Sequence, residues 1–291
     1  MRSFKRTKGD FVFDSINYML MLGIIVVTLY PFYYVLVASF APISQIISGK
    51  VLLWPASVSL QAYRTVLNNP LIPRSYYNTI FITCFGTLFS MTLTVIGAYV
   101  LSKKYLPGRP QLTFMVVFTM LFNGGLIPTF LTVKALGFGN TLWVLIIPSG
   151  LSAFYLVVMR NFFAELPSSL EESASIDGAS QLTILLRIYL PLSLPVLATF
   201  FLFYAVGYWN AFFNAIIYLS DYHYWPVPVV LREALVMGRT DNMFIRDDEF
   251  GAPLENVKMA LIIIAVFPIL CVYPFLQKYF VKGVLIGSIK E

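Results

Sequence analysis

Six long apolar segments run through the chain, and shorter polar segments separate them. An α-helix rises 1.5 Å per residue, so about 20 mostly apolar residues are needed to cross the roughly 30 Å hydrocarbon core of a bilayer. The segments of about this length are 16–40, 76–101, 111–132, 141–159, 188–219 and 259–277. The pattern predicts an all-α membrane protein with six transmembrane helices.

Two of these segments contain residues that break helices. The fifth is longer than one crossing requires, and Pro191 and Pro195 near its start indicate either a tilt or an interfacial helix that leads into it. In the third, the run 123–128 reads Asn-Gly-Gly-Leu-Ile-Pro and interrupts the helix near its outer end. Because glycine lets a backbone or a ligand approach closely, this break predicts either helix packing or contact with a substrate.

The composition supports a membrane protein and excludes two other classes. Hydrophobic residues make up 58% of the chain and charged residues 12%, whereas a soluble domain carries about 25% charged residues. The abundance of aromatic and aliphatic residues also excludes disorder. The net charge of +6 does not indicate nucleic-acid binding, because no basic stripe with interleaved aromatic residues occurs.

The distribution of Lys and Arg predicts the orientation in the membrane. Most basic residues fall on one side if the N-terminus is cytoplasmic, and the short segment 103–109 holds three of them, Lys103, Lys104 and Arg109. The first apolar segment is too long for a signal peptide, so it is expected to stay as an anchor. We therefore expect both termini in the cytoplasm. The expected organisation is a cytoplasmic segment 1–15, one transmembrane domain 16–291, outer loops 41–75 and 220–256, and an inner loop 160–191.

The sequence offers no set of residues for catalysis or for a metal. Cys84 and Cys271 lie far apart in apolar stretches and are expected to be buried, and His223 is the single histidine. Gly49-Lys50 lacks the flanking residues of a phosphate-binding loop. We expect no enzyme activity, no metal and no bound cofactor, so any ATP and Mg would be held by another chain.

The predicted spans contain no charged residue. A proton-coupled carrier usually places an Asp, Glu or His at membrane depth, so proton coupling is disfavoured. Sodium coupling through carbonyl and hydroxyl oxygens stays open, because unwound helices can supply these groups.

The two outer loops are candidates for interactions. Loop 41–75 is too long for a simple turn and predicts a short helix near 60–67, with either an interaction role or a connecting role. Loop 220–256 is net acidic and could meet an extracellular protein or a ligand. Asp247-Asp248 alone is weak support for calcium, because the spacing of an EF-hand is missing.

Polar tips and aromatic rings gather in the fifth segment. Rings stack on sugar faces and amides bond sugar hydroxyls, but membrane interfaces use the same residue types. With the break in the third segment, they form a candidate substrate path of Asn123, Gly124, Tyr204, Tyr208, Trp209, Asn210 and Asn214.

The inner loop predicts two short helices joined at a glycine. Ser168 with Glu171 three residues later is typical of a capping box, and Gly178 suits the left-handed position after a helix end. A second helix is expected from Ser180 to Pro191. Small residues would let a partner come close, and Glu171, Glu172 and Asp177 offer charges to basic groups across the contact.

This loop carries a motif with a fixed spacing. It reads Glu172-Ser173-Ala174, then Gly178, then Ile188, then Leu190-Pro191. The motif resembles the signature loop of permease subunits in ATP-binding-cassette importers, with Ser173 in place of an alanine. Asp177-Gly178-Ala179 and the six-span layout resemble the carbohydrate branch of the MalG type. The run 123–129 is similar to a subgroup that imports complex oligosaccharides in Gram-positive bacteria.

The resemblance implies half of a type I importer of MetI/MalG-like architecture in a bacterial cell membrane. The implied partners are a homologous second permease, a cytoplasmic ABC ATPase dimer that holds ATP and Mg, an extracellular solute-binding protein and membrane lipid. The loop would supply a coupling helix that contacts the ATPase through Glu171, Glu172, Ser173, Ala174, Asp177, Gly178 and Ala179. Three alternatives stay open: a permease for a non-sugar solute, an ion-coupled carrier, and a membrane enzyme, for which no nucleophile, base or metal set converges.

Overall fold

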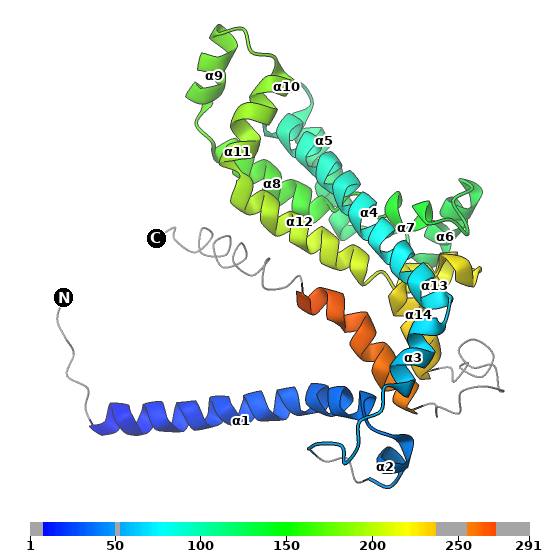
Figure 1. The fold of residues 1–291 in the computed structure, drawn as a ribbon. Helices are drawn as coiled ribbons and strands as arrows, with labels where there is room; N and C mark the ends of the chain where they lie inside the picture. The colour runs from blue at the N-terminus through cyan, green and yellow to red at the C-terminus, as the bar shows by residue number, and fades with distance from the viewer. Residues whose placement is uncertain (1–7, 50–52, 237–254, 272–291) are drawn as a thin grey trace. The chain divides into compact units, whose positions relative to one another are not determined.

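The computed structural model describes residues 8–49, 53–236 and 255–271, and these residues form helices without any strand (Figure 1). The all-α prediction is confirmed for this part of the chain. The helices in chain order are α1 (Lys8–Ser39), α2 (Ile43–Ile47), α3 (Gln61–Asn68), α4 (Leu71–Ser102), α5 (Arg109–Leu121), α6 (Leu126–Ala135), α7 (Trp143–Ile146), α8 (Ala153–Glu165), α9 (Ser168–Ile176), α10 (Gln181–Ile184), the π-helix η1 (Leu185–Tyr189), α11 (Leu190–Leu192), α12 (Leu194–Trp209), α13 (Phe213–Tyr218), the 3₁₀ turn η2 (Tyr222–Tyr224), α14 (Val227–Val236) and a last helix over 255–271.

The chain forms two compact units. Unit 1 combines residues up to Asn69 with 233–267, and unit 2 is centred on Pro70–Arg232. In unit 1, α1 is a long apolar helix whose side chains are almost all exposed, as expected for a span that contacts lipid or another chain. The predicted short helix in loop 41–75 is present as α3. The hydroxyls of Ser39 and Tyr63 lie 2.7 Å apart and hold α3 against the end of α1.

In unit 2, α4 packs against α8 and α12. Two hydroxyl pairs, each 2.8 Å apart, join α4 to α12: Ser90 with Tyr208, and Thr94 with Tyr204. Residues four apart share a helix face. Ser90 and Thr94 therefore lie on one face of α4, and Tyr204 and Tyr208 lie on one face of α12. Since the lower number on α4 meets the higher number on α12, the two helices run antiparallel. Hydroxyl groups therefore fix both the register and the direction of this contact.

The six-span layout is only partly found in the described residues. Two helices are long and apolar enough to cross a membrane, Gly9–Ser39 and Leu71–Ser102. Two helix pairs qualify as broken spans: Arg109–Leu121 with Leu126–Ala135, bent by 116°, and Gln181–Leu192 with Leu194–Trp209, bent by 87°. The described residues therefore contain two to four candidate spans, and six crossings stay a prediction.

The breaks in these pairs fall where the sequence predicts them. Gly125 has φ +90 between α5 and α6, a value that glycine adopts without strain. The second break lies at Ser193, between Pro191 and Pro195. Both breaks follow from proline and glycine chemistry.

The predicted spans 141–159 and 188–219 contain further breaks, so neither is one continuous helix. The segment 141–159 contains α7 and the start of α8, separated by 147–152, where Pro148 and Gly150 interrupt helical hydrogen bonding. Within 188–219, α12 ends at Trp209 and a separate helix, α13, follows. The last helix covers 255–271, and the remainder of the predicted span 259–277 lies outside the described residues.

The expectation that both cysteines are buried is also wrong, because Cys84 and Cys271 are exposed. In a membrane, lipid tails are as apolar as a protein core. An apolar sequence context therefore does not distinguish a buried side chain from one that faces lipid or a partner.

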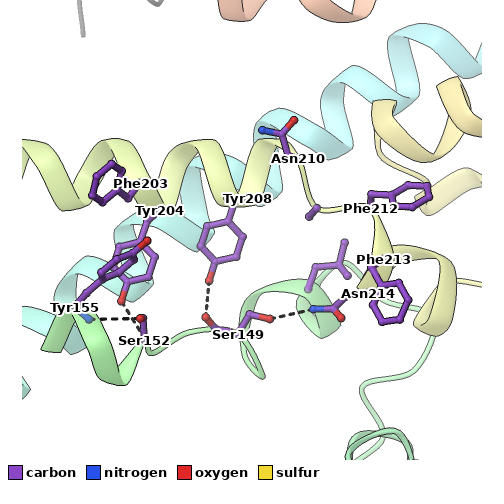
Figure 2. Close-up of a pocket in the computed structure, with 13 residues that line it drawn as sticks. Ser149, Ser152, Tyr155, Phe203, Tyr204, Tyr208, Asn210, Phe212, Phe213 and Asn214 are labelled. Carbon is purple, nitrogen blue, oxygen red and sulfur yellow. Dashed lines mark hydrogen bonds between the residues drawn. The ribbon is translucent and has the colours of Figure 1, made fainter. Parts of the chain in front are cut away.

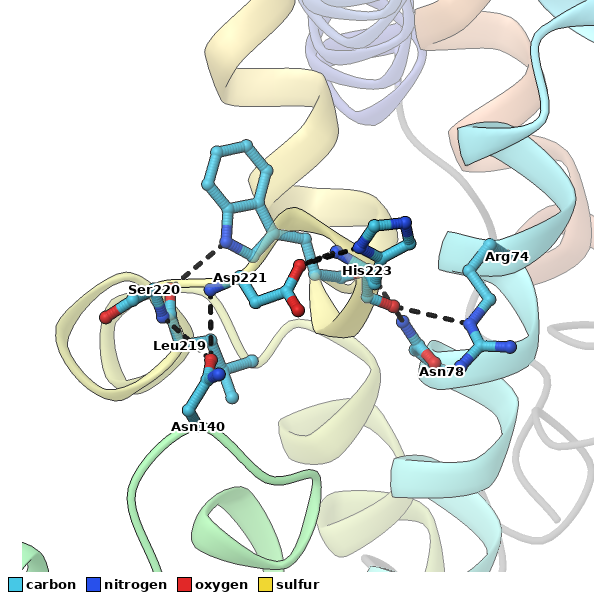
Figure 3. Close-up of polar contacts among 8 residues, drawn as sticks. Arg74, Asn78, Asn140, Leu219, Ser220, Asp221 and His223 are labelled. Carbon is cyan, nitrogen blue, oxygen red and sulfur yellow. Dashed lines mark hydrogen bonds and ion pairs between the residues drawn. The ribbon is translucent and has the colours of Figure 1, made fainter.

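A polar network holds one end of unit 2 together (Figure 3). Asn140 has a left-handed backbone, φ 57, and its Oδ1 accepts hydrogen bonds from the backbone N–H groups of Ser220 and Asp221. The carbonyl of His223 accepts from Asn78 Nδ2 at 2.8 Å and from Arg74 Nε at 3.4 Å. The network thus joins the turn before α7, the segment after α13 and the start of α4.

Within the same network, Asp221 and His223 form an exposed pair with 2.8 Å between Oδ1 and Nδ1. Hydrogen bonds from the backbone and the side chain of His223 hold the pKa of Asp221 below its ordinary value. Most of the acidic segment 220–256, predicted as an outer loop, follows this point, and its residues 237–254, including Asp247-Asp248, lie outside the described residues.

Candidate functional site

A cavity of about 420 Å³ lies in unit 2 where α7, α8, α12 and α13 meet (Figure 2). Its walls come from the ends of these helices and from the non-helical segments 147–152 and 210–212. Ligand pockets usually have volumes of about 300–1,000 Å³, so this one can hold a small molecule. Broken helices that line a cavity are the usual place of substrate sites in transporters.

Four residues of the predicted substrate path line this cavity: Tyr204, Tyr208, Asn210 and Asn214. Three do not, namely Trp209, Asn123 and Gly124. Asn123 instead stabilises the break before α6, because its Oδ1 accepts the backbone N–H of Gly125 at 2.9 Å. The part in transport of these three residues stays a prediction.

The two tyrosines form the wall of the cavity with their hydroxyls already engaged. The Tyr204 hydroxyl pairs with Thr94 and also accepts the backbone N–H of Ser152 at 3.1 Å. The Tyr208 hydroxyl pairs with Ser90 and lies 3.4 Å from the Ile146 and Ser149 carbonyls. Both side chains are buried. They hold the non-helical segment 147–152 against α12 and offer their ring surfaces to the cavity.

Two amide residues, Asn210 and Asn214, also line the cavity, and both are exposed. Asn214 Nδ2 makes one long hydrogen bond of 3.4 Å to Ser149 Oγ, whereas Asn210 Nδ2 donates to the Val206 carbonyl at 2.9 Å, and its side chain points away from that of Tyr208 (Figure 2). The ring of Tyr155 stacks on Phe200 and Phe203, with centroids 5.0 and 5.9 Å away. Amides and aromatic faces suit a polar, uncharged ring such as a sugar.

No charged residue is among the described residues that line the cavity. An ionised group of a ligand would therefore meet only hydroxyl and amide dipoles from these described residues.

Sequence reasoning missed part of this wall, including Ser149, Ser152 and Tyr155. The available signal was Pro148 with Gly150 inside an apolar run, since a helix break at membrane depth is tolerated where it lines a cavity.

The segment 160–191, which the sequence predicts as an inner loop, contains the two predicted helices. α9 ends in a Schellman motif: Gly178 has φ +77, its N–H donates to the Ser175 carbonyl at 3.1 Å, and the Ala179 N–H donates to the Ala174 carbonyl at 2.9 Å. Ser180 is the N-cap of the second helix, and its hydroxyl accepts the Thr183 N–H. It continues through the π-helical turn η1 to α11. These features confirm the helix, glycine, helix prediction.

The predicted capping box is wrong. Pro167 occupies the N-cap position, so Ser168 is already inside α9. Glu171 does not fold back on the helix start, because its carboxylate pairs with Lys103 Nζ at 2.7 Å. The carboxylate pairs with Lys103 rather than with a backbone N–H at the helix start, because an ion pair with a hydrogen bond is the stronger interaction.

The other residues of α9 and its end divide between two faces. Ala174 and Ala179 pack against the apolar cluster around Tyr99, Phe163 and Tyr189. The exposed residues from Glu172 to Gly178 are Glu172, Ser173, Ser175, Ile176, Asp177 and Gly178. Ile176 has 87% of its surface exposed, and the sequence did not single it out. Ile176 therefore adds an exposed apolar side chain beside the carboxylates of Glu172 and Asp177.

Figure 1 shows α9 and α10 at one end of the packed helices of unit 2, away from α6 and α13. The cavity and this loop are therefore separate sites joined by the long helices. Within the described residues, no group of three or more His, Cys, Asp or Glu side chains could hold a metal ion.

Comparisons with known proteins agree on one family. The pattern of the family described as the binding-protein-dependent transport system inner membrane component matches residues 12–286. The polygalacturonan/rhamnogalacturonan transport system permease protein YtcP of Bacillus subtilis is 46% identical, over 96% of this chain and 98% of the relative. Protein LplC of the same organism is 44% identical, over 98% and 97%. A crystal structure of a bacterial ABC transporter involved in the import of the acidic polysaccharide alginate contains a similar chain. That chain has a TM-score of 0.89 and 35% identity, with coverage of 96% of this chain and 100% of that one.

Proposed function

This chain belongs to the family of binding-protein-dependent transport system inner membrane components, and from that premise we propose that it is the permease subunit of an ABC importer for oligosaccharides. Two of the similar proteins are named for polysaccharides, YtcP for polygalacturonan/rhamnogalacturonan and the importer of known structure for the acidic polysaccharide alginate, which supports a carbohydrate substrate. Fragments of polyuronides are therefore the first substrates to test. A non-sugar solute is the second candidate within the same family.

The cavity carries the substrate part of the proposal. Its uncharged wall of amides, hydroxyls and stacked rings recognises sugar faces and hydroxyls. The path through the membrane is shared with a homologous second permease, and an extracellular binding protein delivers the sugar. Asn123, Gly124 and Trp209 would contact the sugar elsewhere along the path.

The exposed face of α9 carries the coupling part. Ile176, Glu172 and Asp177 present an apolar side chain flanked by carboxylates, which suits a cleft with basic rims on a cytoplasmic ATPase. That ATPase holds ATP and Mg, and this chain is not catalytic. The other predicted coupling residues, Ser173, Ala174, Gly178 and Ala179, shape the helix end that enters the cleft.

The membrane arrangement completes the proposal. We infer six crossings of the bacterial inner membrane, in which α5 with α6, α7 with α8, and the segment around α12 are broken spans. Both termini and α9 then face the cytoplasm, where Lys103, Arg109 and Arg160 lie at the end of α4, as the positive-inside rule requires.

Reconstitution tests this function. The chain is assembled in proteoliposomes with its second permease, its ATPase and its binding protein, and uptake of labelled uronide and neutral oligosaccharides is measured with and without ATP. We expect uptake that stops when the ATPase carries a substitution that blocks hydrolysis. Accumulation of sugar by this chain alone under a sodium or proton gradient would instead identify an ion-coupled carrier.

A pair of substitutions tests the cavity. Tyr155→Ala removes a ring from the wall, and we expect the concentration for half-maximal transport to rise about tenfold, equivalent to about 1.4 kcal/mol of binding. Phe154→Ala is the matched control, because Phe154 is exposed and does not line the cavity. Equal effects of the two substitutions would contradict this site.

A further inference from the structure

One ion pair fastens α9 to the rest of unit 2. No residue of α9 is fully buried, but Glu171 reaches inward to Lys103, the residue that follows α4, with 2.7 Å between Oε2 and Nζ. The Lys103 side chain is 7% exposed and the Glu171 side chain 17%. Lys103 is therefore buried and Glu171 partly buried, whereas the neighbouring Glu172 is exposed.

Aromatic residues surround this pair. Lys103 Nζ lies 3.9 Å from the centroid of the Tyr99 ring and 4.5 Å from that of Tyr189. It also donates to the Tyr189 hydroxyl at 3.3 Å, and that hydroxyl donates to Glu171 Oε2 at 3.1 Å. Cation–π contacts and hydrogen bonds thus satisfy both charges. Side chains from α4, α9 and η1 meet in this one cluster.

The tyrosines extend the cluster to the start of α10. The Tyr99 hydroxyl donates to Gln181 Oε1 at 2.6 Å. The end of α4 therefore contacts both α9 and the beginning of the second helix. The end of α4 is itself fixed, because the Leu101 carbonyl accepts from Arg109 Nε at 2.9 Å and from Arg160 Nε at 3.3 Å. Both helices of the inner loop are therefore anchored to a rigid helix end.

The energetics favour a pair that stays closed. Removing one partner from a buried ion pair leaves a charge without compensation, which is strongly unfavourable. Glu171 is therefore poorly placed to swing out toward another protein. Burial raises the pKa of the Glu171 carboxyl, but the hydrogen bond and the charge of Lys103 outweigh this and hold that pKa below its ordinary value.

The same helix connects this cluster to the cavity. On α4, Thr94 lies nine residues before Lys103 and pairs with Tyr204, and Ser90, one turn before Thr94, pairs with Tyr208. Both tyrosines line the cavity. A displacement of α9 that moves Lys103 therefore reaches the cavity wall through one continuous helix and two hydroxyl pairs.

We propose that the Lys103–Glu171 pair is the link that transmits movement of α9 to α4 and the cavity wall, and that Glu171 is a positioning residue that does not touch the ATPase. This inference rests on the proposed docking of α9 on an ATPase. It changes the expected role of Glu171, which the sequence placed among the residues that face the partner.

The test compares Glu171→Gln with Glu172→Gln, two identical substitutions at adjacent positions that differ in the direction of the side chain. Each variant is assembled with the second permease, the ATPase and the binding protein. Three quantities are measured: the amount of ATPase that co-purifies, the rate of ATP hydrolysis, and the sugar imported per ATP hydrolysed. The last ratio does not change when a fraction of the protein is merely unfolded.

For Glu171→Gln we expect normal co-purification of the ATPase, continued ATP hydrolysis, and about tenfold less sugar per ATP, which is within the usual range of coupling between sites. For Glu172→Gln we expect weaker co-purification, with the ratio unchanged in the complexes that form.

Two results would overturn the inference: loss of the ATPase from the Glu171→Gln complex, or an unchanged amount of sugar per ATP in that complex. A wild-type complex that shows no ATP-driven uptake would refute the proposed function itself. The two failures are therefore distinguishable.

Discussion

The ring of Tyr208 on α12 covers Gly86 on α4, and a Cβ atom at Gly86 would lie 2.8 Å from three carbon atoms of that ring. The hydroxyl at the tip of the same ring lies 2.8 Å from the Ser90 hydroxyl, one turn along α4. The Tyr208 side chain thus packs on Gly86, contacts Ser90 and also forms part of the cavity wall.

This relationship predicts the effect of adding a methyl group at Gly86. In Gly86→Ala the Tyr208 ring must shift, and its hydroxyl cannot keep its contacts with Ser90 and the 147–152 segment. We expect a loss of stability of about 1–3 kcal/mol, typical of overpacking, together with reduced transport. Thermal unfolding of the purified protein in detergent measures the first effect.

Gly207→Ala is the matched control, because Gly207 also lies in a helix of unit 2 and a Cβ there would meet no atom within 4 Å. It should leave the unfolding temperature unchanged or raise it, since alanine is the better helix former. A similar loss of stability in both variants would show that the ring contact is not the cause.

The end of α9 gives a prediction based on backbone strain alone. Gly178 has φ +77, and a Cβ there would meet no atom within 4 Å. Gly178→Val therefore introduces no clash, but it places a branched residue in the left-handed region, at a cost of about 1–2 kcal/mol or more. We expect loss of transport with normal membrane insertion, measured by uptake and by the yield of the assembled complex.

Gly178→Asn separates strain from side-chain bulk, because asparagine tolerates the left-handed region better than valine. It should retain more transport than Gly178→Val. Equal loss in the two variants would instead indicate that the partner requires a bare backbone at this position.

Local chemistry explains what the sequence could predict. The Schellman end at Gly178, the short helix α3 and the breaks at Gly125 and Ser193 follow from glycine, proline and apolar spacing within a few residues. The candidate residues Tyr204 and Tyr208 were found in the same way, from residue type and position.

Long-range pairing explains what the sequence could not predict. A capping box at Ser168 and Glu171 is a local rule, but Lys103, 68 positions before Glu171, takes the carboxylate. The engagement of the Tyr204 and Tyr208 hydroxyls likewise depends on residues more than 100 positions away. Continuous spans failed at 147–152 because hydropathy averages over a proline and a glycine that separate two helices.

The exposed face of α9 predicts a hot spot for binding of the ATPase. Ile176 is 87% exposed, and burial of an isoleucine at an interface contributes about 1.5–3 kcal/mol. Ile176→Ser should therefore weaken binding of the ATPase by about 10-fold or more, with normal stability of the permease. Titration of detergent-solubilised permease complex with ATPase measures the change in affinity.

Leu182→Ser is the control for this substitution, because Leu182 is 64% exposed on α10 rather than on α9. It should change the affinity little. If Leu182→Ser weakens binding as much as Ile176→Ser, the docking surface extends over both helices of the loop.

The attachment of α9 predicts a dependence on acidic pH. The pKa of Glu171 lies below its ordinary value of 4.5 because Lys103 outweighs the effect of burial. A carboxyl with a depressed pKa in the folded state contributes its full stabilisation above the ordinary value, and this is lost as the pH falls through the depressed one. The other titratable groups that face it, Lys103, Tyr99, Tyr105 and Tyr189, stay protonated throughout that range.

We therefore expect hydrogen–deuterium exchange in α9 to be slower in the wild type than in Glu171→Gln from neutral pH down to about pH 5, and this difference to disappear only below about pH 4. Comparing the two proteins at each pH removes the intrinsic effect of pH on exchange. A difference that already disappears between pH 7 and 6 would mean that a group other than Glu171 controls the attachment. A difference that is absent at every pH would mean that the ion pair does not hold α9 at all.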